Sequence, residues 1–135
     1  MPSLRHVHLY TGLLFLGVFV ASGQYMDLGY DHLRGMADGP RLLFRSAHIY
    51  LLFSAVVNLL LGSYLQRYGA RRARALQLIG SLLLLAAPML LTLSFFTESQ
   101  DLSFIRPMAR IAIYGTLVGA GLHFFAGLSS KGRDA

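Results

Sequence analysis

Five histidines are the side chains of this 135-residue sequence that are best suited to chemistry. Imidazole can ligate a metal, hold haem iron or carry a proton near neutral pH. The sequence contains no cysteine, which excludes disulfides, thiolate metal sites and iron–sulfur clusters. The role that each histidine can take therefore depends on which other side chains lie at the same level on the neighbouring elements.

Four long apolar segments make up most of the sequence. Only 13% of the residues are charged and the mean hydropathy is +0.54, which is too apolar for a soluble domain of this size. The segment 42–65 has Arg45 as its one charged residue, and at about 1.5 Å per residue it can cross roughly 30 Å of hydrocarbon. The predicted spans are residues 5–26, 42–65, 75–96 and 107–128. We therefore predict an all-α membrane protein with a single membrane domain, residues 1–135, whose four transmembrane helices form an up-and-down antiparallel bundle.

Arginines between the second and third spans indicate the orientation of the chain. The loop 66–74 holds four arginines and no acidic residue, so the positive-inside rule predicts that this loop is cytoplasmic. The outer loop 27–41 mixes acidic with basic residues. Both termini are then predicted to be cytoplasmic, in a multi-pass protein of the inner (cell) membrane. The net charge of +6 indicates contacts with anionic membrane lipids rather than with nucleic acid.

The first and fourth spans carry histidines at matching depth on the same side, namely His8 and His123. Glycines recur at helical spacing around both: Gly12 follows His8, and Gly115, Gly119 and Gly127 share a row with His123. Glycines let a flat macrocycle approach the backbone, so we predict haem b between helices 1 and 4, with the two histidines as iron ligands. Gly12 and Gly119 would line this cofactor site, and Arg71 and Arg72 would neutralise the haem propionates. Since His6 and His8 point to different sides of a helix, the sequence leaves open which of them faces inward.

A second polar site is predicted nearer the outer face. His48 and Asn58 are costly to expose to lipid and are expected to face a neighbouring helix, a cavity or a ligand, and Tyr114 is the third residue of this predicted site. With the loop acids they form a candidate vestibule for a quinone headgroup, a proton or a divalent metal. A structural hydrogen bond explains His48 equally well, and Asn58 also fits a packing seam between helices.

Three classes of function follow from these residues. The leading prediction is a haem-binding electron-transfer protein, with quinone as a further cofactor. The first alternative is a non-catalytic membrane subunit or assembly factor without a cofactor, whose glycine rows contact a second copy or other subunits. The second alternative is a small transporter or channel, with His48 and Asn58 along its path. Phosphate-binding, hydrolase and zinc-protease motifs are absent from the sequence, so only a redox activity is considered.

Overall fold

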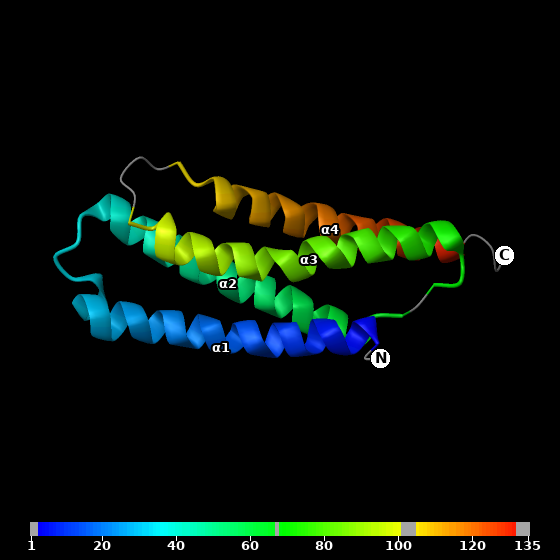
Figure 1. Cartoon of the computed structure of the whole chain (residues 1–135), viewed down its shortest axis with the longest axis horizontal. Coiled ribbons are helices and arrows are strands. Elements are labelled where there is room, and N and C mark those ends of the chain that lie inside the picture. The colour runs from blue at the N-terminus through cyan, green and yellow to red at the C-terminus, as the bar shows by residue number, and fades with distance from the viewer. Residues whose placement is uncertain (1–2, 67, 101–104, 132–135) are drawn as a thin grey trace.

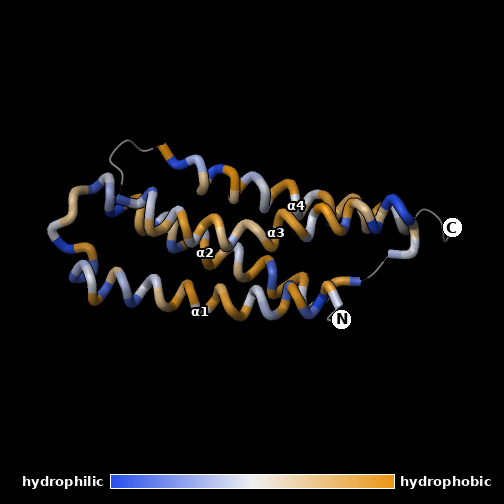
Figure 2. Tube along the Cα trace, viewed as in Figure 1, coloured by the Kyte–Doolittle hydropathy of each residue, from blue (hydrophilic) through white to orange (hydrophobic). Residues whose placement is uncertain are grey.

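The computed structural model describes residues 3–66, 68–100 and 105–131, with side chains up to residue 129. The elements are α1 (Leu4–Tyr30), the 3₁₀ turn η1 (Asp31–Leu33), α2 (Asp38–Tyr64), α3 (Arg71–Thr97) and α4 (Pro107–Lys131). Four of these helices are long and apolar enough to cross a membrane, and apolar residues dominate their length in Figure 2. The prediction of an all-α, polytopic membrane protein is confirmed.

The helices form two antiparallel hairpins that pack side by side. α1 packs mainly against α2, and α3 packs mainly against α4, while α2 and α3 form most of the contact between the hairpins. α1 begins and α4 ends at the same end of the bundle, as Figure 1 shows. The predicted up-and-down bundle of four helices is therefore the observed architecture.

Three of the predicted helix boundaries lie about one turn inside the observed ones. α1 continues to Tyr30 rather than ending at residue 26, α2 begins at Asp38 rather than 42, and α3 begins at Arg71 rather than 75. The outer loop shrinks to residues 31–37. Pro40 lies in the first turn of α2, where backbone N–H groups have no partner within the helix, so proline is tolerated.

The loop between α1 and α2 is tightly turned. Asp31, His32 and Leu33 have φ values of 46°, 58° and 62°, in the left-handed region that residues with a Cβ rarely adopt. This turn buries Leu33, which is 4% exposed and packs in the main hydrophobic cluster of the bundle. The apolar burial of Leu33 offsets part of the backbone strain.

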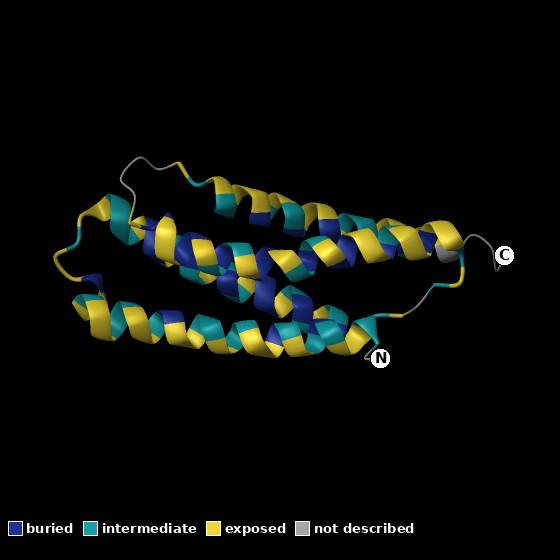
Figure 3. Cartoon of the chain, in the orientation of Figure 1, coloured by how far each residue is buried: buried dark blue, intermediate teal, exposed yellow. Residues whose placement is uncertain are grey.

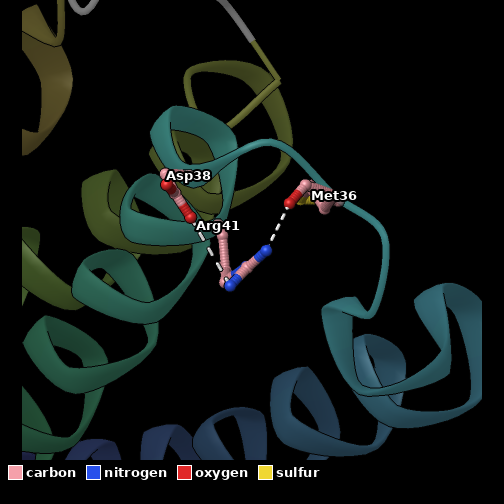
Figure 4. Close-up of polar contacts among 3 residues, drawn as sticks. All are labelled: Met36, Asp38 and Arg41. Atoms are coloured by element: carbon pink, nitrogen blue, oxygen red, sulfur yellow. Dashed lines mark hydrogen bonds and ion pairs between the residues drawn. The ribbon is translucent and has the colours of Figure 1, made fainter.

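Arg41 connects this loop to the start of α2. Its Nη2 donates a hydrogen bond to the carbonyl oxygen of Met36 at 2.6 Å, and its Nη1 lies 3.5 Å from a carboxylate oxygen of Asp38 (Figure 4). The guanidinium thus joins the loop backbone to the first turn of the helix.

The core lies along the centre of the bundle. The buried surfaces in Figure 3 are concentrated on α2 and α3, whereas α1 and α4 expose more of their side chains. Phe44 and Leu51 of α2 pack with Leu91 and Phe95 of α3, and each of these four side chains is at most 1% exposed. The large apolar side chains on the outer faces are those that lipid would cover.

Candidate functional site: a histidine chain that links the four helices

Four polar side chains, one from each helix, form a continuous hydrogen-bonded chain inside the bundle. His8 of α1 is fully buried, and its Nδ1 lies 2.7 Å from Oδ1 of Asn58 on α2. Nε2 of His8 lies 2.9 Å from Oγ of Ser81 on α3. The same serine oxygen lies 3.1 Å from Nε2 of His123 on α4. We call Asn58, His8, Ser81 and His123 the histidine chain.

The partners of Asn58 assign the protons along this chain. Nδ2 of Asn58 donates to the carbonyl oxygens of Ser54 and Leu84, at 3.0 and 2.9 Å, so its Oδ1 must accept. Nδ1 of neutral His8 therefore carries the proton, and its Nε2 accepts the hydroxyl proton of Ser81. Oγ of Ser81 in turn accepts from Nε2–H of His123. The chain runs in one direction, and each donor in it has an acceptor.

His123 is the end of the chain that reaches the surface of the bundle. The Cδ2 edge of its ring lies against α3, only 2.9 Å from the position that a Cβ at Gly80 would occupy. The opposite ring edge, which carries Nδ1, faces away from α3, and no hydrogen bond to Nδ1 occurs within the described parts of the chain. The ring lines a cavity of about 390 Å³, and the remaining lining residues are Val57, Leu60, Leu61, Tyr64, Leu84 and Ala120.

The structure brings the two predicted iron ligands together. The rings of His8 and His123 have centroids 6.1 Å apart and planes 80° apart. His8, not His6, is the inward residue, since His6 is exposed and its Nδ1 lies 2.8 Å from Oγ of Ser3. The hydroxyl of Ser81 occupies the space between the two Nε2 atoms.

The two glycines predicted to line the cofactor site lie close to the backbone of neighbouring helices. A Cβ at Gly12 would lie 2.7 Å from the backbone nitrogen of Leu59, and one at Gly119 would lie 2.9 Å from the carbonyl oxygen of Gly80. These glycines therefore allow α1 to approach α2 and α4 to approach α3, which is the usual role of small residues between membrane helices. The space beside Gly12 and Gly119 is filled by this neighbouring backbone.

The arginines predicted at this site lie at some distance from the histidines. Arg71 and Arg72 are exposed in the first turn of α3. Nine residues separate Arg72 from Ser81 in the sequence, which is about 13 Å along a helix axis. Arg5 lies three residues before His8 on α1, and its Nε donates a hydrogen bond to the carbonyl oxygen of Gly62 at 2.9 Å.

The three residues of the predicted outer site are not brought together. Nδ1 of His48 lies 2.8 Å from Oγ of Ser22, and its ring stacks on Phe19 with centroids 4.1 Å apart. Asn58 belongs to the histidine chain, and Tyr114 is 65% exposed on the outer face of α4. His48 therefore makes a helix–helix contact between α1 and α2.

Ser81 connects the two histidines, although it is not among the predicted site residues. Its hydroxyl is 1% exposed, yet a single serine in a helix rich in leucine gives no sign of which way it faces. Its place directly after Gly80, at the depth of the histidines, is the one signal available in the sequence.

A second polar cluster at the opposite end of the bundle was also missed. Glu98 is 6% exposed, and its carboxylate accepts hydrogen bonds from N–H of Met108 at 2.7 Å and of Ala109 at 3.1 Å. The hydroxyl of Ser94 donates to the same carboxylate at 2.5 Å. The carboxylate thus caps the N-terminus of α4, where negative charge is favoured.

Arg106 precedes this capped helix. Its Nη1 donates to Oγ of Ser46 at 2.7 Å, which joins the start of α4 to α2. Burial lowers the pKa of the Arg106 guanidinium, and the nearby carboxylate of Glu98 opposes this shift. Arginine keeps its charge despite such shifts, so this end of the bundle holds the half-buried guanidinium of Arg106 and the buried carboxylate of Glu98.

No family model matches the chain, and no curated protein or solved structure shows significant similarity to it. The fold and the site define its class as a polytopic four-helix membrane protein with two histidines joined through a serine hydroxyl, one of them fully buried. Its function must be argued from the geometry of the histidine chain.

Proposed function

We propose that the histidine chain is a proton relay, which accepts a proton at His123 and holds it on His8. One observation carries this proposal: the hydroxyl oxygen of Ser81 is within hydrogen-bonding distance of Nε2 of both histidines, at 2.9 and 3.1 Å. A hydroxyl can receive a proton from one side and release its own to the other, so it can connect two imidazoles that do not touch.

The transfer follows from the proton positions assigned above. A proton that binds Nδ1 of His123 makes this ring a cation, whose Nε2 proton then passes to Oγ of Ser81. The serine releases its own proton to Nε2 of His8. The net result is a neutral His123 with its proton on Nδ1 and a cationic His8, whose two N–H groups face the oxygens of Asn58 and Ser81.

A purely structural role accounts less well for the choice of histidine. Serine and asparagine alone would join the helices, whereas ionisable residues within a membrane are costly and mark sites of proton or ion movement. Imidazole is also the side chain that changes charge near neutral pH. No carboxylate hydrogen-bonds to the histidine chain within the described residues, so the two imidazole rings are the groups of this chain that can change charge.

The test is nitrogen NMR of ¹⁵N-histidine-labelled protein in lipid nanodiscs, titrated with acid. We expect His8 to gain its second proton at the same pH at which the proton of His123 moves from Nε2 to Nδ1. In the Ser81→Ala variant the two changes should occur at different pH values. His48 serves as the internal control, because its titration should be the same in both proteins. If His123 becomes doubly protonated while His8 stays neutral, the relay is wrong.

Haem b ligated by His8 and His123 is the second candidate, favoured by the 6.1 Å between the ring centroids. A bound haem would supply one-electron transfer. Such binding requires Ser81 to leave the space between the rings. It also requires α1 to move away from α2, and α4 from α3, because Gly12 and Gly119 already contact the backbone of these neighbours.

The visible spectrum of the purified protein tests this second candidate. A Soret band that disappears in His8→Ala and His123→Ala, and persists in the matched control His6→Ala, would support haem binding. A colourless protein purified from cells with ample haem would contradict it.

A further inference from the structure

The cavity beside His123 lies between α2 and α4, and Leu84 of α3 completes its lining. It measures about 390 Å³ and opens on one side to the outside of the bundle. Its lining is apolar apart from the ring of His123 and the hydroxyl of Tyr64. An opening of this composition within a membrane-spanning segment faces lipid, so its ligand would enter from the bilayer.

The proton positions in the histidine chain decide which polar group a ligand must present. Neutral His123 donates from Nε2 to Ser81, so its Nδ1 carries a lone pair and can only accept. A ligand that pairs with it must therefore supply an O–H or N–H donor. A quinone carbonyl, an ester or an ether has no such donor, and a lipid acyl chain would leave Nδ1 without a partner.

The size of the cavity limits the ligand further. An apolar cavity of about 150 Å³ accommodates benzene, so 390 Å³ has room for a substituted six-membered ring. We infer that this cavity binds a lipophilic phenol or hydroquinone. Its ring lies among Leu60, Leu61 and Ala120, its hydroxyl donates to Nδ1 of His123, and its apolar tail leaves through the open side.

Binding depends on the cavity and on His123, whereas the fate of the ligand's proton rests on the proposed relay. A phenolic hydroxyl at Nδ1 stands at the point where the relay accepts a proton. Both proposals therefore depend on His123. Ser81 distinguishes them, because it takes part in the relay and does not line the cavity.

The test measures binding of an alkylated hydroquinone to the full chain in lipid nanodiscs by calorimetric titration. The comparison ligand is its dimethyl ether, which has the same ring and tail but no donor. We expect the hydroquinone to bind about fivefold more tightly, the value of one hydrogen bond. Ala120→Phe should abolish binding of both ligands by filling the cavity, and the matched control Ala86→Phe, on the exposed face of α3, should leave binding unchanged.

Two further variants distinguish recognition of the ligand by His123 from proton transfer through Ser81. His123→Phe keeps a ring of similar size without nitrogen, so it should remove the preference for hydroquinone over ether. Ser81→Ala should bind hydroquinone normally even though the relay is interrupted. The inference is overturned if wild type binds both ligands equally, which would indicate an acyl-chain groove, or if Ala120→Phe still binds. Circular dichroism of each variant shows whether the bundle has folded.

Discussion

Substituting Gly62 with alanine should separate α1 from α2 and break the histidine chain from a distance. A Cβ at this position would lie 2.6 Å from both the Cα and the backbone nitrogen of Leu9. Backbone atoms cannot rotate away, so the helices themselves must move apart. Leu9 directly follows His8, and the buried imidazole would move with it.

The loss of stability expected for Gly62→Ala can be worked out from these contacts. Restoring an ordinary carbon–carbon separation of about 3.5 Å requires a shift of about 0.9 Å. The same shift would lengthen the His8–Asn58 contact from 2.7 Å to about 3.6 Å, which is too long for a hydrogen bond. Overpacking costs about 1–3 kcal/mol, the lost hydrogen bond about 0.6, and the better helix propensity of alanine returns about 0.5–1. We expect Gly62→Ala to lower the free energy of unfolding by about 1–3 kcal/mol.

The assay is unfolding of the protein in mixed micelles by increasing amounts of SDS, followed by circular dichroism. Gly17→Ala on α1 is the matched control, because an added Cβ there meets nothing within 4 Å. The control should stabilise the protein slightly, by about 0.5–1 kcal/mol. Equal stability of the two variants would refute the conclusion that Gly62 is required for close approach of the hairpin helices.

Three other outcomes follow from the structure. Glu98→Gln should lower the free energy of SDS unfolding by about 1 kcal/mol, since the cap of α4 loses its charge, while Asp38→Asn at an exposed helix start should change it less. Asn58→Leu should cost about 1–3 kcal/mol in the same assay and shift the His8 nitrogen resonances, because it leaves Nδ1 of His8 without an acceptor and the carbonyl oxygen of Leu84 without a donor. If the arginine-rich end is cytoplasmic, a cysteine replacing Gly69 should react with a membrane-impermeant maleimide only after cells are opened, and one replacing Ala37 should react in intact cells. The reverse labelling pattern would contradict the proposed orientation.

The number and type of the elements were predictable because a long apolar segment has few stable alternatives to a membrane-spanning helix. The residues at which the helices begin and end were less predictable. Residues 71–74 carry three arginines, which are disfavoured at a helix N-terminus, so the loop prediction was reasonable. Ala73 in this turn is fully buried, and its packing against the rest of the bundle extends the helix.

The pairing of His8 with His123 was predictable from depth and side alone. The role of the glycines was not, because spacing reveals a shared face without revealing what covers it. Gly119 contacts the backbone of α3, whereas Gly115, four residues earlier, meets nothing within 4 Å. Ser81 escaped prediction for the same reason, since its function depends on how α3 is rotated about its axis.

The division of the bundle into two hairpins bears on how the protein is made. The segment between α2 and α3 is the only covalent connection between the halves, and the contacts within each half exceed those between them. Each pair of helices can enter the bilayer as a unit and meet its counterpart afterwards. Two polypeptides encoded separately, divided within residues 65–70, should therefore reassemble into the intact protein, and the hydrogen bond from Ser81 to His8 should fix the position of one half relative to the other along the membrane normal.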